Sequence, residues 1–269
     1  MTQGRIGLSI VIPAYKESTK IGADIRAASD FLRENSIAGE IIVVDDGSAD
    51  GTAEAAASFE REHPELLVLS YERNRGKGHA LALGMLRARG DIVMFADSGL
   101  CVPYEIATIG IKMLELDMCD IANGSRRMRG SIRKEQPFYR KAGSLVYRGV
   151  VHAVMGVPRY IADTQCGFKL YKREVARQLF SEAITDGFMF DVEIILRALK
   201  HGYRILEFPV IWSNDADTRY DPIKGTIRNF KELARMKWAF MRKAPRALER
   251  EEPHLVAPAG ADSGFIHAG

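Results

Sequence analysis

Carboxylate side chains occur where they could hold the polar groups of a ligand. Asp45 and Asp46 open the run Asp45-Asp46-Gly47-Ser48, and Asp97 follows a separate apolar run. Carboxylate oxygens accept hydrogen bonds from base N–H and sugar hydroxyl groups, and one or two of them can hold Mg²⁺ together with phosphate oxygens and water. These residues predict a site for a polar, phosphate-bearing ligand. For the acidic pair, an Asx-type turn that simply ends a strand is the alternative interpretation.

A glycine-rich basic segment at residues 73–78 has the sequence RNRGKG and precedes a helical pattern. Backbone N–H groups and a cation at a helix N-terminus form a suitable environment for a diphosphate. The glycine spacing does not match the P-loop, which excludes an ATPase of that class. We expect Lys77 to face phosphate groups, and a glycine-rich connection with a solvated lysine is the alternative.

Three carboxylates in the second half of the chain could act on an acceptor, namely Asp163, Asp191 and Glu193. One of them could act as a general base and deprotonate a hydroxyl group of a substrate. A phosphate group, with a second pKa of about 6, is already largely ionised at neutral pH and needs no strong base. Asp191 would then position hydroxyl groups of a substrate or orient a cation. Alternatively, Asp191 has only a structural role, because a carboxylate at a helix N-terminus is stabilised by the helix dipole.

Short apolar runs alternate with helical patterns through the first half of the chain. The expected strands cover 8–12, 40–45, 66–70, 91–96 and 119–124, and the expected helices cover 19–35, 52–59, 78–89 and 103–117. This alternation is typical of βαβ units and predicts a largely parallel sheet. Ligands of such sheets bind at the carboxyl ends of the strands. That edge would gather Tyr15, Asp46 and Asp97.

The second half is less regular. Its expected elements are a basic loop at 126–134, an amphipathic segment at 139–155, a loop and strand at 163–170, a helix at 190–200 with Gly202 as its C-cap, a strand at 205–211 that Pro209 would break or place at an edge, and a long helix at 223–241. Residues 246–269 are rich in Pro, Ala and Gly and predict a disordered tail.

The composition excludes several classes of protein. With 46% hydrophobic and 27% charged residues, the 269-residue chain is typical of a globular protein rather than a disordered one. Its three cysteines are odd in number and widely spaced, which fits a reducing compartment and excludes a disulfide framework or zinc spacing. No apolar run approaches the roughly 20 residues that span a bilayer, and no signal-peptide segment is found at the N-terminus.

Charge is divided unevenly along the chain. Residues 1–125 contain 12 Lys and Arg against 19 Asp and Glu, whereas residues 126–269 contain 26 against 16. The basic half predicts an anionic partner such as phosphate groups or a membrane surface, and a solvated charged surface is the alternative. Nucleic acid is not an expected partner, because the basic half shows no recognition motif.

Several motifs follow one another in an order that carries a resemblance. The sequence contains Val11-Ile12-Pro13-Ala14-Tyr15-Lys16-Glu17, Val43-Val44-Asp45-Asp46-Gly47-Ser48, the segment at 73–78, Asp97, Asn123-Gly124-Ser125-Arg126-Arg127, Asp163-Thr164-Gln165-Cys166-Gly167-Phe168-Lys169 and Phe190-Asp191-Val192-Glu193. This ordered set resembles glycosyltransferase family 2, which has the GT-A fold. Its last two motifs are similar to those of the branch that contains dolichyl-phosphate β-glucosyltransferase and related polyprenyl-phosphate sugar transferases. The resemblance covers about residues 7–240.

The resemblance implies an α/β nucleotide-diphospho-sugar transferase of the GT-A fold, with a mainly parallel twisted sheet and helices on both faces. It implies a single domain over 1–245, with a donor-nucleotide half at 7–125 and an acceptor half at 126–245. Asp46 would accept a hydrogen bond from the base N–H, and Glu17 would hold the ribose or the base edge. The implied donor-binding residues are Pro13, Ala14, Tyr15, Glu17, Val44, Asp46, Lys77, Asp97, Arg126 and Arg219, and the implied catalytic residues are Asp191, Asp163, Arg219 and Lys77.

The family usually carries Asp-x-Asp at the position of Asp97, and the second aspartate holds Mg²⁺ or Mn²⁺. Gly99 stands two residues after Asp97 in this chain, so the need for a divalent metal stays open. Asp97 alone could bind the ion. Alternatively, basic side chains could neutralise the diphosphate directly, namely Lys77, Arg126 and Arg219. Arg219 stands where the family has a lysine that reaches the donor phosphates.

The long helix at 223–241 combines bulky apolar residues with Lys and Arg. This pattern is typical of an interfacial membrane helix, although packing against the domain would produce it too. The basic loop at 126–134 would either meet the acceptor phosphate or face water. We expect a cytoplasmic protein with, at most, peripheral contact to the inner face of the cell membrane.

These observations together predict an inverting transferase that moves a hexose from a nucleoside-diphosphate sugar to a polyprenyl phosphate, with UDP-glucose slightly favoured over GDP-mannose. Two alternatives stay open. One keeps the donor chemistry but uses a soluble hydroxyl acceptor, and it needs a true base at Asp191 or Asp163. The other is a non-catalytic nucleotide-sugar-binding protein that lacks a full metal site.

Overall fold

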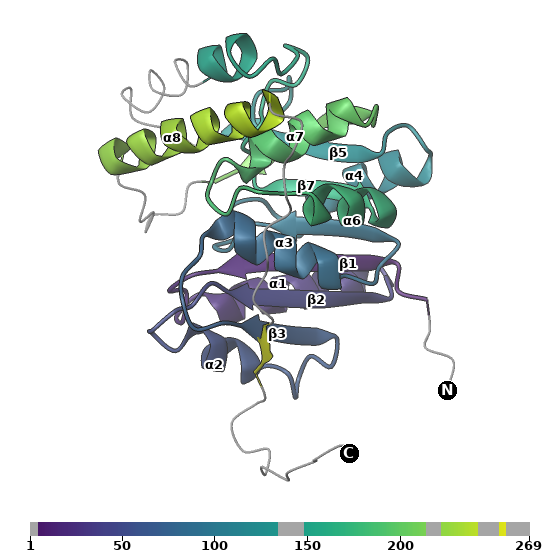
Figure 1. Cartoon of the computed structure of the whole chain (residues 1–269). Coiled ribbons are helices and arrows are strands. Elements are labelled where there is room, and N and C mark those ends of the chain that lie inside the picture. The colour runs from purple at the N-terminus through teal and green to yellow at the C-terminus, as the bar shows by residue number, and fades with distance from the viewer. Residues whose placement is uncertain (1–4, 134–147, 214–221, 242–252, 257–269) are drawn as a thin grey trace, which may run out of the picture.

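The computed structural model describes residues 5–133, 148–213, 222–241 and 253–256 (Figure 1). Within these ranges, eight strands form one sheet in the order β10-β3-β2-β1-β4-β7-β5-β8. The strands are β1 (Leu8–Ala14), β2 (Gly39–Asp45), β3 (Leu66–Ser70), β4 (Ile92–Ala96), β5 (Ile121–Ser125), β7 (Phe168–Lys172), β8 (Ile205–Pro209) and β10 (His254–Leu255). The sheet is mostly parallel, which confirms the fold class that the alternating pattern predicts.

Strand β1 lies between β2 and β4, and all of its residues are buried. It runs parallel to both neighbours, with Ile10 opposite Ile41 of β2 and Met94 of β4. The strand continues through Pro13, where the sequence predicts its end. Pairing with β4 stops at Val11, so the N–H that Pro13 lacks is not required for pairing on that side.

Helices cover both faces of the sheet. One face carries α1 (Ile21–Glu34), α2 (Thr52–Ala57), the 3-10 turn η1 (Tyr104–Ile106) and α4 (Ala107–Glu115), and the other carries α3 (Lys77–Arg87), α6 (Arg173–Ser181) and α7 (Phe190–Lys200). Each helix turns an apolar stripe toward the sheet. In α1 the buried residues Ile21, Ile25, Ala28 and Leu32 recur at helical spacing.

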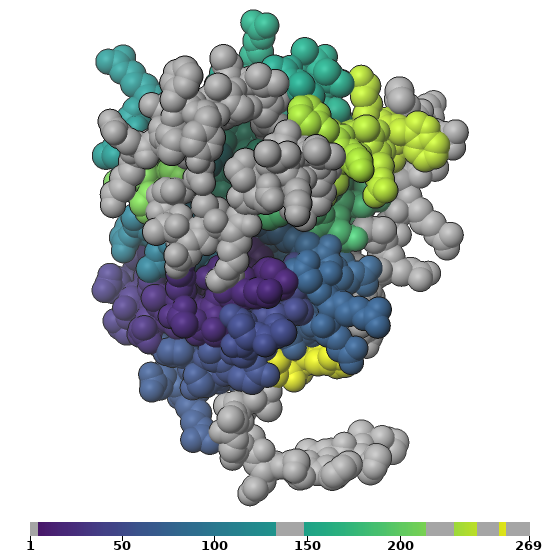
Figure 2. Space-filling model, turned by 90° about the vertical axis from the view of Figure 1, so that its left-hand side faces the viewer, coloured from purple at the N-terminus to yellow at the C-terminus, as the bar shows by residue number. Residues whose placement is uncertain are grey.

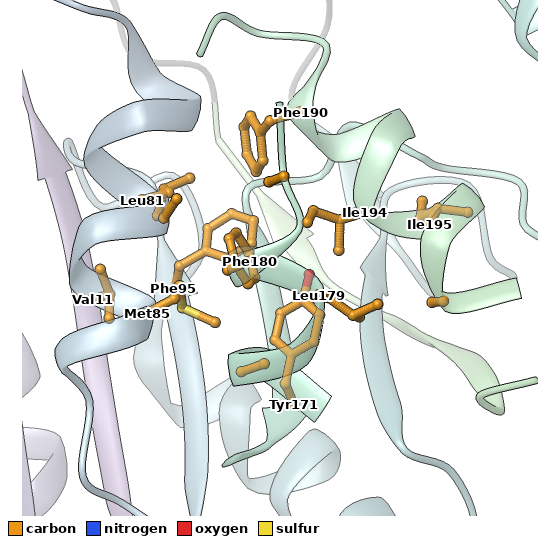
Figure 3. Close-up of a cluster of buried hydrophobic side chains, with 14 of the residues drawn as sticks. Val11, Leu81, Met85, Phe95, Tyr171, Leu179, Phe180, Phe190, Ile194 and Ile195 are labelled. Carbon is orange, nitrogen blue, oxygen red and sulfur yellow. The ribbon is translucent and has the colours of Figure 1, made fainter. Parts of the chain in front are cut away.

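Aromatic side chains join α7 to the middle of the sheet (Figure 3). Phe95 of β4 stacks on Tyr171 of β7 with ring centroids 6.4 Å apart, and it meets Phe190 of α7 edge-on at 5.8 Å. Tyr171 meets Phe180 of α6 in the same edge-on manner at 5.8 Å. Such pairs add to the free energy gained from burial alone. They fix the N-terminus of α7, where Asp191 lies, relative to β4.

Strand β7 lies between β4 and β5 and runs antiparallel to both. Lys169 of β7 pairs with Phe95 of β4 and with Asn123 of β5. The sequence predicts a strand here, but its direction and place follow from long-range pairing. This insertion brings the Asp163–Lys169 segment between the ends of β4 and β5.

After Pro209 the chain leaves the main sheet, as the proline predicts. Strand β9 (Ile211–Trp212) then pairs in parallel with β6 (Ile132–Arg133). These two strands form a small separate sheet. We call them, together with residues 126–131 that precede β6, the β6–β9 ribbon. Strand β6 therefore lies within the segment that the sequence predicts as a basic loop.

The long helix α8 (Pro222–Met241) lies across the upper end of the molecule in Figure 1. Leu233 and Met236 are buried against the core, whereas Phe230 and Trp238 are 40% and 54% exposed. One face of α8 thus packs on the domain, and another presents aromatic side chains to solvent. None of the described helices is long and apolar enough to cross a membrane.

Other elements differ from the expected boundaries. The helix expected at 103–117 is divided into η1 and α4. Part of the amphipathic segment expected at 139–155 lies outside the described residues, and residues 148–153 of it are helical. The prediction of a disordered tail is wrong at β10, which pairs with the edge strand β3 and places His254 opposite Ser70. Residues 246–252 and 257–269 lie outside the described residues.

Candidate active site

The carboxyl ends of β1, β2 and β4 meet at one edge of the sheet, because these strands are parallel and adjacent. Figure 2 looks onto the side of the molecule where β1 ends. The segment after β1 is tied to the segment after β2: Lys16 N donates to Ser48 Oγ at 2.8 Å, and Glu17 N donates to Thr52 Oγ1 at 2.9 Å. Tyr15 is 38% exposed beside them.

Three of the predicted donor-binding residues are part of the sheet itself. Pro13 and Ala14 end β1, and Pro13 pairs with Val44 of β2. All three are buried, and Val44 belongs to the hydrophobic core. Any contact of these residues with a ligand therefore uses the backbone at the strand ends, and the side chain of Val44 has a packing role instead.

Asp46 is buried and uses both carboxylate oxygens inside the protein. Oδ1 accepts from Tyr71 Oη and Arg75 N, each at 2.7 Å, and Oδ2 accepts from Gly76 N at 2.9 Å and from Asn74 Nδ2 at 2.9 Å. Burial raises the pKa of Asp46, although these donors oppose the rise. This arrangement differs from the predicted hydrogen bond to a base N–H. In this geometry Asp46 shapes the glycine-rich segment at 73–78.

Asp45 is the other member of the acidic pair. Its Oδ2 accepts from Ser48 N, three residues later, at 3.1 Å, which is a local side-chain contact within the turn that follows β2. Its Oδ1 is buried and has no hydrogen-bond partner in the described part of the chain. Burial raises the pKa of Asp45. Asp45 thus contributes to a local turn, whereas Asp46 holds the backbone of the segment at 73–78.

Lys77 begins α3 at the end of the glycine-rich segment. Gly76 has a φ of +113°, and a Cβ there would lie 2.5 Å from the carbonyl oxygen of Asp186, so the position favours glycine. Lys77 Nζ lies 2.5 Å from Asp97 Oδ1. Burial alone would lower the pKa of Lys77, but the charges of Asp97 and Asp191 raise it. Lys77 is therefore a fixed cation at a helix N-terminus, as the sequence predicts.

Asp97 follows β4 and is held by the loop that leads into β7. Its N–H donates to Gly167 O at 2.9 Å, and a Cβ at Gly167 would lie 2.0 Å from the Asp97 carboxyl carbon. The residues that follow Asp97 in the chain are fixed by Asp24 of α1, whose carboxylate accepts from Gly99 N and Leu100 N at 3.0 Å. Glycine at 167 is what leaves room for the Asp97 carboxylate.

The donor set at Asp97 fits a divalent ion only in part. Neither Phe95 nor Gly99, two residues to either side, carries a carboxylate, and the described residues contain no group of three or more His, Cys, Asp and Glu that could hold a metal. One carboxylate is nevertheless enough for Mg²⁺ when phosphate oxygens and water complete its coordination. Asp97 therefore fits the ion as a single protein ligand in the presence of a diphosphate.

Asp163, which is buried, forms an ion pair with the half-buried Arg126. Arg126 Nε lies 2.7 Å from Asp163 Oδ2, and Arg126 Nη2 lies 2.8 Å from Asp163 Oδ1. The guanidinium also lies 5.6 Å from the ring centre of Trp212. Although burial opposes ionisation, Arg126 lowers the pKa of Asp163 to about 2. A carboxylate with this pKa is a poor base, so Asp163 is better suited to hold Arg126 than to accept a proton.

Asp191 lies in the first turn of α7 and is paired with Lys169. Lys169 Nζ lies 2.5 Å from Asp191 Oδ1 and donates to Cys166 O at 2.7 Å, and both side chains are almost fully buried. Burial raises the pKa of Asp191, whereas the charges of Lys169 and Lys77 oppose the rise. Asp191 is thus the better base of the two predicted catalytic aspartates.

The structure brings Lys77, Asp97 and Asp191 together with Lys169, since their charges interact. Arg219 lies outside the described residues. A functional role of Lys169, Gly167 or Asp24 is not among the sequence-based predictions. Lys169 and Gly167 occur in the motif at 163–169, which is the signal that could have identified them, whereas nothing in the sequence points to Asp24.

Comparisons with known proteins bear on the family and the fold of the chain. The family model described as Glycosyl transferase family 2 matches residues 9–180. A dolichyl-phosphate beta-glucosyltransferase from Dictyostelium discoideum is 31% identical over 249 residues, covering 88% of this chain and 75% of the relative. The enzyme of the same name from Saccharomyces cerevisiae is 30% identical over 254 residues, with coverage of 88% and 75%.

Two solved structures show the same fold. Glucosyl-3-phosphoglycerate synthase from Mycobacterium tuberculosis, in complex with Mn²⁺, UDP and phosphoglyceric acid, has a TM-score of 0.62 at 21% identity, over 87% of this chain and 79% of that one. Mannosyltransferase PcManGT from Pyrobaculum calidifontis, in complex with GDP-Man and Mn²⁺, has a TM-score of 0.57 at 19% identity, over 91% and 67%. Both likenesses confirm the predicted GT-A fold.

Proposed function

From the premise that this chain belongs to glycosyl transferase family 2, and is therefore a glycosyltransferase, we propose that it transfers glucose from UDP-glucose to a polyprenyl phosphate with inversion at the sugar carbon. The acceptor is supported by relatives named dolichyl-phosphate beta-glucosyltransferase, of which this chain covers about three quarters. The donor is supported by the sugar in those names. The observation that carries the proposal is the cluster of Lys77, Asp97 and Asp191 at the carboxyl edge of the sheet.

The donor diphosphate would bind at the N-terminus of α3. The partial positive charge at a helix N-terminus and the Lys77 ammonium together favour an anion there. Lys77 is already fixed by Asp97, so little reorganisation is needed when negative charge develops on the leaving diphosphate. Lys77 would therefore stabilise the departing nucleotide more than the bound substrate.

A divalent ion would bind through Asp97, and when bound it would neutralise charge on the diphosphate. Solved structures of the same fold with Mn²⁺ support such an ion in general. Binding would require Asp97 to exchange part of its contact with Lys77. We therefore expect Lys77 and the ion to share the task of neutralisation.

The acceptor phosphate would attack the anomeric carbon directly. A bond forms between a phosphate oxygen and C1 of glucose, the bond from C1 to the diphosphate oxygen breaks, and UDP leaves. The phosphate oxygen is largely ionised at neutral pH, so Asp191 need not remove a proton. Asp191, held by Lys169, would instead orient the sugar hydroxyls, and Arg126 with Asp163 would shape the acceptor side.

Donor binding is tested by calorimetric titration with UDP-glucose and GDP-mannose, each with Mg²⁺, Mn²⁺ or EDTA. We expect UDP-glucose to bind at least about tenfold more tightly, and Lys77→Ala to weaken that binding about tenfold or more. Lys112→Ala, on the exposed surface of α4, is the matched control and should bind normally. Binding of neither sugar nucleotide would overturn the proposal.

The acceptor is tested by the effect of Asp191→Asn on transfer. A phosphate acceptor should tolerate the loss of a base, so transfer to polyprenyl phosphate should fall far less than the roughly 10²–10⁴-fold that general base catalysis contributes. Transfer to a soluble hydroxyl compound, with abolition by Asp191→Asn, would favour the alternative acceptor class. No transfer to either acceptor by a protein that binds UDP-glucose would contradict catalysis.

A further inference from the structure

The β6–β9 ribbon presents apolar side chains to solvent. Ile132 of β6 pairs with Ile211 of β9, and the two are 58% and 44% exposed. Met128, in the loop before β6, is 37% exposed. Single exposed apolar residues are normal on protein surfaces. Here two branched side chains are direct cross-strand neighbours, so they form a continuous apolar ridge.

The ribbon is fixed to the protein immediately beside the candidate active site. Ser131 Oγ donates to the carbonyl oxygen of Ser125, the last residue of β5, at 2.6 Å. On the other strand, Ser213 N donates to Cys101 O at 2.9 Å. Trp212 lies under the guanidinium of Arg126, which is paired with Asp163. A surface that contacts the ribbon therefore lies next to the acceptor side of the site.

The charged residues within the described part of the ribbon, residues 126–133 and 211–212, are all basic, namely Arg126, Arg127, Arg129 and Arg133. Arg129 is exposed, whereas Arg126 is paired with Asp163 outside the ribbon. Apolar side chains among Lys and Arg residues are the composition that binds an anionic membrane interface.

We propose that the β6–β9 ribbon is the surface through which the protein rests on an anionic lipid bilayer, with Ile132 and Ile211 inserted among the acyl chains and Arg129 at the headgroups. The inference rests on the proposed function, because a polyprenyl-phosphate acceptor is anchored in a membrane. Contact at the ribbon would bring the acceptor phosphate to the Arg126 side of the site. A second copy of this chain is a poor occupant, because a symmetric contact would bring two basic loops together.

The direct test is sedimentation of the full chain with vesicles of equal parts phosphatidylcholine and phosphatidylglycerol. We expect binding to these vesicles and little binding to phosphatidylcholine alone. Ile132→Ser with Ile211→Ser should weaken binding about tenfold or more, because less apolar surface is buried. The matched control, Ile109→Ser on α4, removes an isoleucine of 40% exposure elsewhere and should bind normally. Equal binding by the double variant and the wild type would overturn the proposal.

The contribution of basic charge to vesicle binding is tested separately by Arg129→Gln. This variant is expected to fold, because the side chain of Arg129 is exposed. One basic residue near an anionic surface accounts for about a fivefold change in binding, and high salt should remove that difference. Loss of a wild-type dimer in the isoleucine variant, observed by sedimentation velocity without lipid, would show a second copy as the occupant. That result would also overturn the proposal.

Transfer rates with soluble and membrane-bound acceptors distinguish a failure of the membrane surface from a failure of the proposed function. With a short-chain, water-soluble polyprenyl phosphate and no membrane, the double isoleucine variant should transfer glucose at the wild-type rate. With a long-chain acceptor in vesicles, its rate should fall about tenfold in parallel with binding. If the wild type fails to transfer to either acceptor but binds vesicles through the ribbon, the proposed function fails and the membrane surface stands.

Discussion

At the scale of single residues, the pair formed by Lys169 and Asp191 decides which carboxylate can act in the site. Both side chains are buried, with Nζ and Oδ1 2.5 Å apart. A buried charge without a partner is costly, and the charge of Lys169 opposes the rise in the pKa of Asp191 that burial causes. Asp163 is held instead by Arg126, which lowers its pKa to about 2. The two aspartates therefore differ in how readily they accept a proton, although the resemblance implies a catalytic role for both.

Replacing Lys169 by Met should raise the pKa of Asp191, because the nearest positive charge that favours the carboxylate is lost. We expect the carboxyl carbon resonance of Asp191, followed by NMR as the pH is changed, to titrate at a clearly higher pH in the variant than in the wild type. Lys172→Met, on the same strand but paired with Asp117 and Asp120, is the control and should leave that titration unchanged. An Asp191 titration that stays in place in Lys169→Met would contradict the role given to this pair.

The pair of Asp163 and Arg126 should make the protein sensitive to acid. The pKa of Asp163 is about 2 in the folded protein and 3.8 ordinarily. A lowered pKa stabilises the fold above pH 3.8, and this stabilisation, about 2 kcal/mol, is lost as the pH falls toward 2. Between pH 5 and pH 3, the free energy of unfolding in urea should fall about 1 kcal/mol more in the wild type than in Asp163→Asn. Asp30→Asn, at an exposed pair with Arg33, should keep the full wild-type decrease.

Ordered motifs predicted where Lys77, Asp97 and Asp191 lie, because each follows a strand or begins a helix whose pattern is local. The direction of the Asp46 carboxylate was not predictable in the same way. It depends on the Tyr71 hydroxyl and the amides of the segment at 73–78, which reach it from another strand. A sequence pattern identifies a polar residue at a strand end but not which neighbours satisfy it.

At the scale of elements, β7 has the largest effect on the site. Its place between β4 and β5 buries Lys169 and sets Gly167 against Asp97. The strand itself was predictable from its apolar residues, but its antiparallel direction was not, because that depends on pairing with strands distant in the sequence. The parallel strands of the first half were predicted closely since each βαβ unit is formed by neighbouring segments.

Replacing Gly167 by Ala should displace the Asp97 carboxylate, since the new Cβ would lie 2.0 Å from its carboxyl carbon. The φ of Gly167 lies outside the left-handed region, so the effect is steric. We expect kcat/KM to fall about a hundredfold and stability to fall by about 1–3 kcal/mol. The control is Gly149→Ala, in the helical segment 148–153, where a Cβ meets nothing within 4 Å. Unchanged kinetics in Gly167→Ala would contradict the role given to this loop.

At the scale of the whole molecule, one sheet joins an acidic half to a basic half, and the candidate site lies where they meet. Lys77 and Asp97 come from the first half, and Arg126, Lys169 and Asp191 come from the second. The basic half also carries the β6–β9 ribbon. This division suits a reaction in which a nucleotide sugar binds one side of the site and an anionic lipid approaches the other.

The overall charge division should make lipid-linked transfer depend on salt. Raising the ionic strength from low to high screens the basic half from an anionic bilayer. We expect the rate with a long-chain acceptor in anionic vesicles to fall about tenfold, while the rate with a short-chain soluble acceptor changes by less than about twofold. Initial rates with both acceptors at the same UDP-glucose concentration measure the difference. If the transfer rates with the two acceptors depended equally on salt, a membrane role for the basic half would be contradicted.

The central claim, inverting transfer of glucose to a polyprenyl phosphate, is tested most directly by identifying the product by NMR. The purified chain is given UDP-glucose and a short-chain polyprenyl phosphate, and the lipid fraction is examined for the configuration at C1 of glucose. The expected product is a glucosyl phosphate whose configuration at C1 is inverted relative to the donor. One molecule of it should form for each molecule of UDP released. Retention of configuration, or release of UDP with free glucose and no glycolipid, would contradict it.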